Sequence, residues 1–155
     1  MSEPVVRTLS ASDLSPALGL ATQALVGSRY LARALELLAL AASGTDAECA
    51  GMIAAIDGDL DALLLHGPLA GAVAVEKVHL LIGRDVQALV PLIDALRRRE
   101  HWRMIVCELA EGREHGVAAA ALVAGGFTRE GSIAGFFDDA TDLALHVLRR
   151  SEPAG

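Results

Sequence analysis

The pattern of apolar and polar positions along the chain predicts a regular order of strands and helices. Alternating or continuous apolar runs bounded by Gly, Pro or Asp predict strands, and apolar residues three or four apart predict helices. The expected strands lie at residues 5–9, 50–56, 61–66, 73–82, 104–109, 127–137 and 142–148. The expected helices run from a cap at residues 10–13 to Val26, over 30–42, within 84–99 and over 116–124. The order is β-α-α-β-β-β-α-β-α-β-β, which is an α/β (α+β) fold class.

The strand at 73–82 changes the phase of its alternation. Val73 and Val75 fall on one parity, whereas Val78, Leu80 and Ile82 fall on the other. One extra residue at Glu76-Lys77 would be a β-bulge. The end of a strand at this place would explain the change equally well.

The start of the helix within 84–99 has two readings because of Pro91. A helix capped by Asp85 would carry the proline inside, at a cost of about 3 kcal/mol. A helix that begins near Val90 would place the proline in the first turn, where it costs little. The second reading leaves residues 83–89 as a loop.

The composition and net charge indicate how many domains the chain has and which classes of binding partner are unfavourable. The chain has 155 residues, 53% of them hydrophobic, which predicts one domain over residues 1–155. A net charge of −7 disfavours binding to nucleic acid. The three arginines at 97–99 are interpreted as the C-terminal end of a helix, where positive charges are favourable. The chain shows no signal peptide and no membrane-length apolar run, so we expect a cytoplasmic protein without a membrane partner. Cys49, Cys107 and the dispersed histidines predict no metal site.

Two segments carry a resemblance to a known family. From Val78 the chain reads V-H-L-L-I-G-R-D-V-Q-A-L-V-P-L-I-D-A-L-R-R-R, and residues 121–127 read A-L-V-A-G-G-F before a hairpin-like tail. This order resembles the GNAT superfamily of acyl-CoA N-acyltransferases. The resemblance implies a mixed, mostly antiparallel sheet with helices on both faces. It also implies transfer of an acyl group, from acetyl-CoA or another acyl-CoA, to a small-molecule amine.

The resemblance also implies where the cofactor binds. In the family, main-chain groups of the fourth strand hold the pantetheine, and a loop of the form [Q/R]-x-x-G-x-G/A holds the pyrophosphate at a helix N-terminus. Here Gln87 and Leu89 stand where that loop has glycines, and the arginine is kept. The candidate cofactor-binding residues are Leu80, Leu81, Ile82, Arg84, Asp85, Val86, Gln87, Ala88 and Leu89.

Acyl transfer to an amine needs a base, which in many family members is a carboxylate on the fourth strand. Glu76 matches that position, and His79 is the second candidate catalytic residue. Each has a structural alternative, a solvated or bulge residue for Glu76 and a hydrogen-bonded core residue for His79. Leu122 stands where the family has a tyrosine acid, and Tyr30 is expected to pack in another helix.

Two functions follow from these residues. Arg84, Glu76 and the kept loop length favour an N-acetyltransferase. The missing glycines and tyrosine favour a degenerate GNAT-fold module without catalysis that binds a ligand or partner. A homodimer is left open as the state of assembly.

Overall fold

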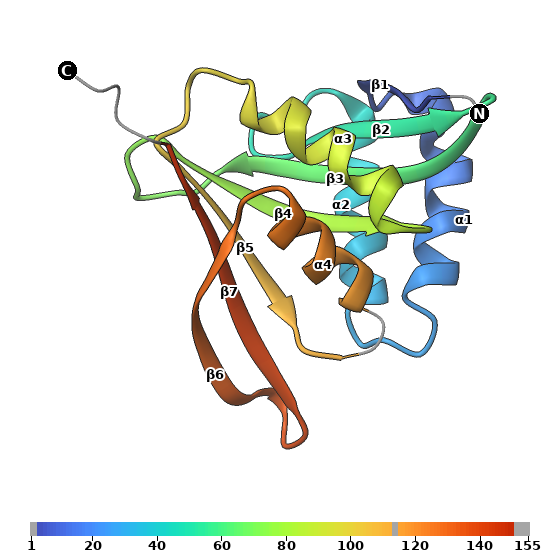
Figure 1. Cartoon of the computed structure of the whole chain (residues 1–155). Coiled ribbons are helices and arrows are strands. Elements are labelled where there is room, and N and C mark those ends of the chain that lie inside the picture. The colour runs from blue at the N-terminus through green and yellow to red at the C-terminus, as the bar shows by residue number, and fades with distance from the viewer. Residues whose placement is uncertain (1–2, 113–114, 151–155) are drawn as a thin grey trace.

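The computed structural model describes residues 3–112 and 115–150, in which seven strands form one sheet between two pairs of helices (Figure 1). The strands are β1 (Val5–Thr8), β2 (Ala50–Ile56), β3 (Asp59–Pro68), β4 (Val75–Gly83), β5 (Met104–Ala110), β6 (Thr128–Asp138) and β7 (Thr141–Arg149). The helices are α1 (Leu14–Ala24), α2 (Leu31–Ser43), α3 (Val86–Arg97) and α4 (Gly116–Ala124), with a 3-10 turn η1 (Ala11–Asp13) before α1. The sheet order is β1-β2-β3-β4-β5-β7-β6, and its neighbours are antiparallel except β4 and β5. The predicted element order and mixed sheet are confirmed.

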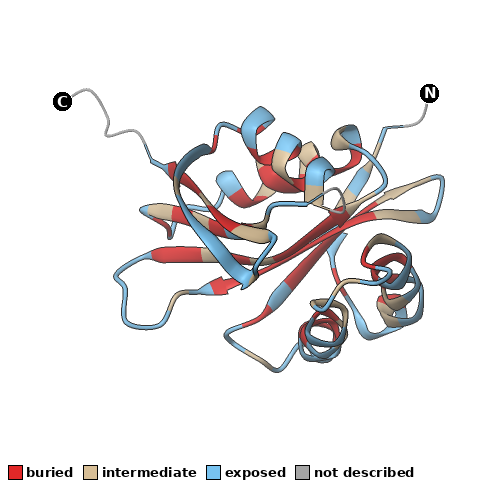
Figure 2. Ribbon diagram, turned by 90° about the horizontal axis from the view of Figure 1, so that it is seen from below, coloured by how far each residue is buried: buried red, intermediate tan, exposed pale blue. Residues whose placement is uncertain are grey.

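Apolar cores lie on both faces of the sheet. On one face, α3 and α4 pack around Leu89, Leu122 and Phe127. On the other, α1 and α2 pack around Leu38 and Ile53. Figure 2 shows the buried residues, in red, along the strands between the helix pairs. Phe127 is only 3% exposed, because the Gly-Gly end of α4 turns the chain back onto the sheet.

The β2–β3 hairpin turns at Asp57 and Gly58, as the sequence predicts. Both residues have positive φ, 53° and 85°, which is the conformation of the tight turns that suit the twist of a hairpin. β3 is longer than the expected strand at 61–66, because it pairs with β2 from Asp59 and with β4 as far as Pro68.

The bulge in β4 is real, but its predicted position at Glu76-Lys77 is wrong. Leu80 pairs with Leu65 and Val78 pairs with His66, so His79 is the extra residue. Val78 packs in the α3/α4 core whereas Leu80 packs in the α1/α2 core, which places the change of face at His79. The sequence pattern misleads because Val73, 80% exposed, lies outside the strand.

Helix α3 begins after Asp85, so the reading that starts the helix near Val90 is wrong. Asp85 has extended backbone, and its Oδ1 accepts a hydrogen bond from the Ala88 N–H at 2.8 Å. This is N-cap geometry, and it stabilises the first turn. Pro91 therefore lies inside the helix and leaves the Gln87 carbonyl without its usual donor. Burial of Ala88 and Leu89 against the sheet compensates for this loss.

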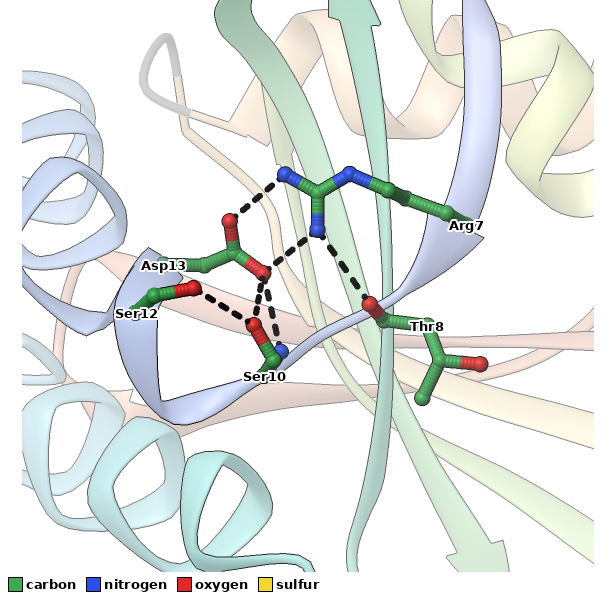
Figure 3. A network of polar contacts seen from close by, with 5 residues as sticks. All are labelled: Arg7, Thr8, Ser10, Ser12 and Asp13. Carbon is green, nitrogen blue, oxygen red and sulfur yellow. Dashed lines mark hydrogen bonds and ion pairs between the residues drawn. The ribbon is translucent and has the colours of Figure 1, made fainter.

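An ion pair fixes the chain between β1 and α1 (Figure 3). Both Asp13 carboxylate oxygens accept hydrogen bonds from Arg7 at 2.7 Å, and Oδ2 also accepts from the Ser10 N–H and hydroxyl. These bonds, that from Arg7 foremost, hold the pKa of Asp13 well below its usual range. The network sets where α1 starts and how it lies on the sheet.

Candidate active site where β4 and β5 separate

β4 and β5 lie side by side where they begin and separate toward their ends (Figure 1). Their parallel pairing starts at Val75 and Met104 and ends at Val78 and Cys107, although both strands continue. The bulge at His79 redirects β4 where the pairing ends, whereas β5 stays paired with β7 along its length. β4 and β5 therefore diverge toward their C-terminal ends. Within the described residues, no strand pairs with the second half of β4 on this side.

A pocket of about 470 Å³ opens at the gap, on the α1/α2 side of the sheet. Residues 77–79 of β4 and 108–110 of β5 line it. The connection between α1 and α2, the loop before β2 and the tip of the β6–β7 hairpin also contribute. This volume lies in the range of small-molecule sites, which combine apolar walls with a few polar groups.

His79 lines this pocket, and its protonation follows from its contacts. Its Nε2 lies 3.0 Å from the Glu48 carbonyl oxygen. Because a carbonyl only accepts hydrogen bonds, Nε2 carries the proton, and Nδ1 of the neutral ring carries the lone pair. Burial lowers the pKa of His79 below 6.5 despite that hydrogen bond, so the ring is neutral at pH 7. His79 can therefore accept a proton.

Tyr30 does more than pack, which corrects the sequence expectation. Its hydroxyl donates a 2.8 Å hydrogen bond to the His79 carbonyl, and the residue lines the pocket. Burial raises the pKa of Tyr30, so the hydroxyl keeps its proton. The side chain of His79 is thus held by Glu48, and its main chain by Tyr30.

Gly67 makes the contact between Glu48 and His79 possible. A Cβ at position 67 would lie 1.7 Å from the Glu48 carbonyl oxygen and 3.0 Å from His79 Nε2. A side chain there would displace the loop that orients the histidine. The sequence shows only a Gly-Pro pair at this place, which reads as the end of a strand.

Glu76 lies outside the residues that line the pocket. Its carboxylate contacts His66 Nδ1 and His101 Nε2, each at 2.9 Å, and the residue is 3% exposed. Burial acts to raise the pKa of Glu76, but the hydrogen bonds with the two histidines outweigh it and lower the pKa. No set of three His, Cys, Asp or Glu residues in the described ranges could hold a metal ion. The structure therefore separates the two candidate bases and leaves only His79 at the pocket.

The candidate residues of the loop after β4 already have partners within the protein. Arg84 Nε lies 3.4 Å from Asp61 Oδ1, and the Arg84 N–H donates to the Asp61 carbonyl. Asp85 caps α3, and the side chain of Leu89 is fully buried. The remaining residues of this set, Val86, Gln87 and Ala88, form the first turn of α3.

Leu80, Leu81 and Ile82 turn their side chains into the two cores. Leu80 and Ile82 belong to the α1/α2 core, and Leu81 to the α3/α4 core. Each is at most 5% exposed. They can therefore meet a ligand in the gap only through main-chain groups.

Sequence reasoning missed most of the pocket wall. The rings of Phe136 and Phe137 meet edge to face with centroids 5.0 Å apart, and they are 54% and 42% exposed at the pocket. Two exposed phenylalanines next to a polar turn were the available signal. Charges of both signs also line the pocket: Arg29, Arg33, Lys77, Asp46, Glu48, Glu108 and Asp138. They come from five separate segments, which a sequence pattern does not connect.

Comparison with solved structures supports the fold. An acetyltransferase of the GNAT family from Bacillus cereus matches with a TM-score of 0.73 at 14% identity, over 96% of this chain and 99% of that one. Ribosomal-protein-alanine N-acetyltransferase from Brucella melitensis matches at 0.72 and 14%, over 94% and 99%. The protein yncA from Salmonella typhimurium, solved with its cofactor acetyl-CoA, matches at 0.72 and 14%, over 98% and 96%. No family model matches the sequence, and no curated protein does. The chain has the GNAT fold, that of acyl-CoA N-acyltransferases.

The residues fit one part of a CoA thioester and not the other. The open edge of β4 suits a pantetheine arm, whose amides can pair with strand main chain. The diphosphate would meet the start of α3, where a carboxylate already occupies the Ala88 N–H.

None of the helices in the described part of the chain has the length and apolar character to cross a membrane.

Proposed function

We propose that this protein is an N-acyltransferase that moves an acyl group from a thioester donor to an amine bound in the pocket. Acetyl-CoA or another acyl-CoA is the donor class that the GNAT fold suggests. The observation that carries the proposal is the position of His79, which Glu48 holds through Nε2 at the pocket where β4 and β5 separate. Fold alone does not decide function. The position of His79 at the pocket adds a chemical reason to propose proton transfer from an amine.

His79 would prepare the amine for attack. An alkylamine is protonated at neutral pH and has no free lone pair, so a base must remove one proton before it can react. The Nδ1 lone pair of His79 can take that proton while Nε2 stays bonded to Glu48. Lys77 lies beside Glu108, 3.6 Å between Nζ and Oε2, which leaves neither charge isolated. Carboxylates along the pocket, such as Asp46 and Glu48, would attract the ammonium form.

The start of α3 favours a second candidate, a GNAT-fold module without catalysis that binds a small ligand in the same pocket. Asp85 occupies the helix terminus that would hold the cofactor diphosphate. Leu122, fully buried, stands where the resemblance places a tyrosine acid. In this second candidate the pocket would recognise a ligand, and His79 would act only as a hydrogen-bonding group.

A thiol-release assay separates the two functions. The protein is incubated with acetyl-CoA and, one at a time, with polyamines, amino acids, aminosugars and short peptides, and free thiol is followed over time. Reactions without amine correct for hydrolysis, and mass spectrometry of the product confirms N-acylation. Amine-dependent thiol release supports the transferase. Its absence with every amine, together with thermal stabilisation by one of them, supports the non-catalytic module.

A further inference from the structure

The N-terminus of α3 is capped by a carboxylate of its own chain. The first N–H groups of a helix have no partner inside it and form a natural anion site. In this helix the Asp85 carboxylate accepts from the Ala88 N–H at 2.8 Å. The carboxylate also places a negative charge at the positive end of the helix dipole. A diphosphate at this helix end would approach the negative charge of Asp85, and it could bind the Ala88 N–H only by displacing that carboxylate.

The neighbouring residues also direct their polar groups to partners within the chain. Asp61 accepts from the Arg84 N–H at its carbonyl, and its carboxylate lies beside the Arg84 guanidinium. Two carboxylates and one guanidinium thus share this corner, and the guanidinium is already paired. A Cβ at Gly83 would come within 2.9 Å of Leu89 Cγ, so the buried Leu89 leaves the strand end little room to move.

The gap between β4 and β5 differs from the start of α3 because its main-chain groups are open to a ligand. Its β4 edge lacks a pairing strand in the described ranges beyond Val78, and it opens into the pocket at His79. An extended arm with two amides can add to such an edge in the way that a peptide strand does. The part of a CoA donor that this chain can hold is therefore the arm that carries the thioester.

We propose that the protein binds its acyl donor through the pantetheine arm alone and that Asp85 keeps the diphosphate of CoA out of α3. The ligand class is a pantetheine thioester, whether or not an adenosine diphosphate is attached. The inference deepens the proposed function and rests on it for the use of a thioester donor. It predicts that the adenosine half of CoA adds little to binding.

The test is calorimetric titration of the whole protein, without amine, with acetyl-CoA and with S-acetyl-pantetheine. The two donors should bind with dissociation constants within about threefold of each other. Asp85→Asn removes the charge and keeps a good N-cap, so acetyl-CoA should bind about tenfold more tightly to it. Asp85→Gly also frees the Ala88 N–H and should tighten acetyl-CoA further. S-acetyl-pantetheine should bind both variants as it binds the wild type.

Asp94→Asn is the matched control, because it removes the same charge from the last turn of the same helix, where Asp94 Oδ1 lies 3.9 Å from Arg97 Nη1. It should leave both titrations unchanged. The proposal is overturned if wild type binds acetyl-CoA more than about tenfold tighter than S-acetyl-pantetheine. It is also overturned if neither donor binds at millimolar concentration, or if neither Asp85 variant tightens acetyl-CoA. A protein that shows the expected binding pattern but transfers no acyl group loses the transferase function and keeps this donor selectivity.

Discussion

Each face of the sheet carries a phenylalanine and a candidate base, but these residues are buried on one face and line a pocket on the other. On the α3/α4 face, Phe127 and Glu76 are both 3% exposed, and the glutamate is matched by two histidines. On the α1/α2 face, Phe136 and His79 line an open pocket. One face is a packed core in which the Glu76 carboxylate is paired with two histidines, and the other ends in a cavity that a ligand can enter.

The bulge in β4 produces this difference. Glu76 precedes the bulged His79 and lies where β4 is still paired with β5. His79 lies where that pairing has just ended. Two candidate bases three residues apart thus come to different environments, and only His79 lines the pocket.

The largest effect should separate the two kinds of phenylalanine. Phe127→Ala should lower the free energy of unfolding by about 3–5 kcal/mol, because it leaves a cavity in a packed core. Phe136→Ala should cost less than about 0.5 kcal/mol, because half of that side chain is already in water. Urea titrations of both variants measure this. Equal losses would show that the hairpin tip belongs to the core.

The next effect concerns catalysis at the two candidate bases. His79→Gln keeps a donor for the Glu48 carbonyl but has no basic nitrogen, so kcat for acyl transfer should fall about 100-fold. Glu76→Gln should change kcat less than about threefold, because its carboxyl contacts His66 and His101 outside the pocket. Steady-state kinetics with the best amine would decide. The reverse pattern would return the role of base to Glu76.

The sequence predicts the order of strands and helices along the chain, because that order depends on local spacing and on glycine, proline or aspartate breaks. It does not place the bulge, because that depends on which residues of β3 face β4. The sequence also leaves the start of α3 open. Residue spacing does not show whether the Asp85 cap and the burial of Leu89 outweigh the cost of Pro91. The charged residues of the pocket wall come from five segments that only the tertiary fold brings together. Spacing along the sequence does not show which distant segments come into contact.

A smaller effect should appear in stability at the α3/α4 face. Glu76→Gln should cost about 2 kcal/mol, since it replaces a charged acceptor of two hydrogen bonds by a neutral one. The pKa of Glu76 is lowered in the fold, so its ionised form stabilises the protein above the ordinary pKa of 4.5. That contribution is lost as pH falls through the folded pKa. Urea titrations at pH 7 and at pH 3 should therefore differ less in the variant, and an unchanged difference would exclude Glu76 as a source of acid sensitivity.

The smallest effect is a shift in the pH profile of the open face. A base must be neutral to act, so kcat/KM should fall as pH drops through the pKa of His79. Burial lowers that pKa, so the midpoint of the acid limb should lie below 6.5. Tyr30→Phe removes the hydroxyl bond to the His79 carbonyl without adding charge, and it should leave this midpoint in place while it weakens the positioning of the ring. A midpoint at or above 6.5 in the wild type would mean that the reacting base is solvated, and the contrast between the two faces would then not extend to the chemistry.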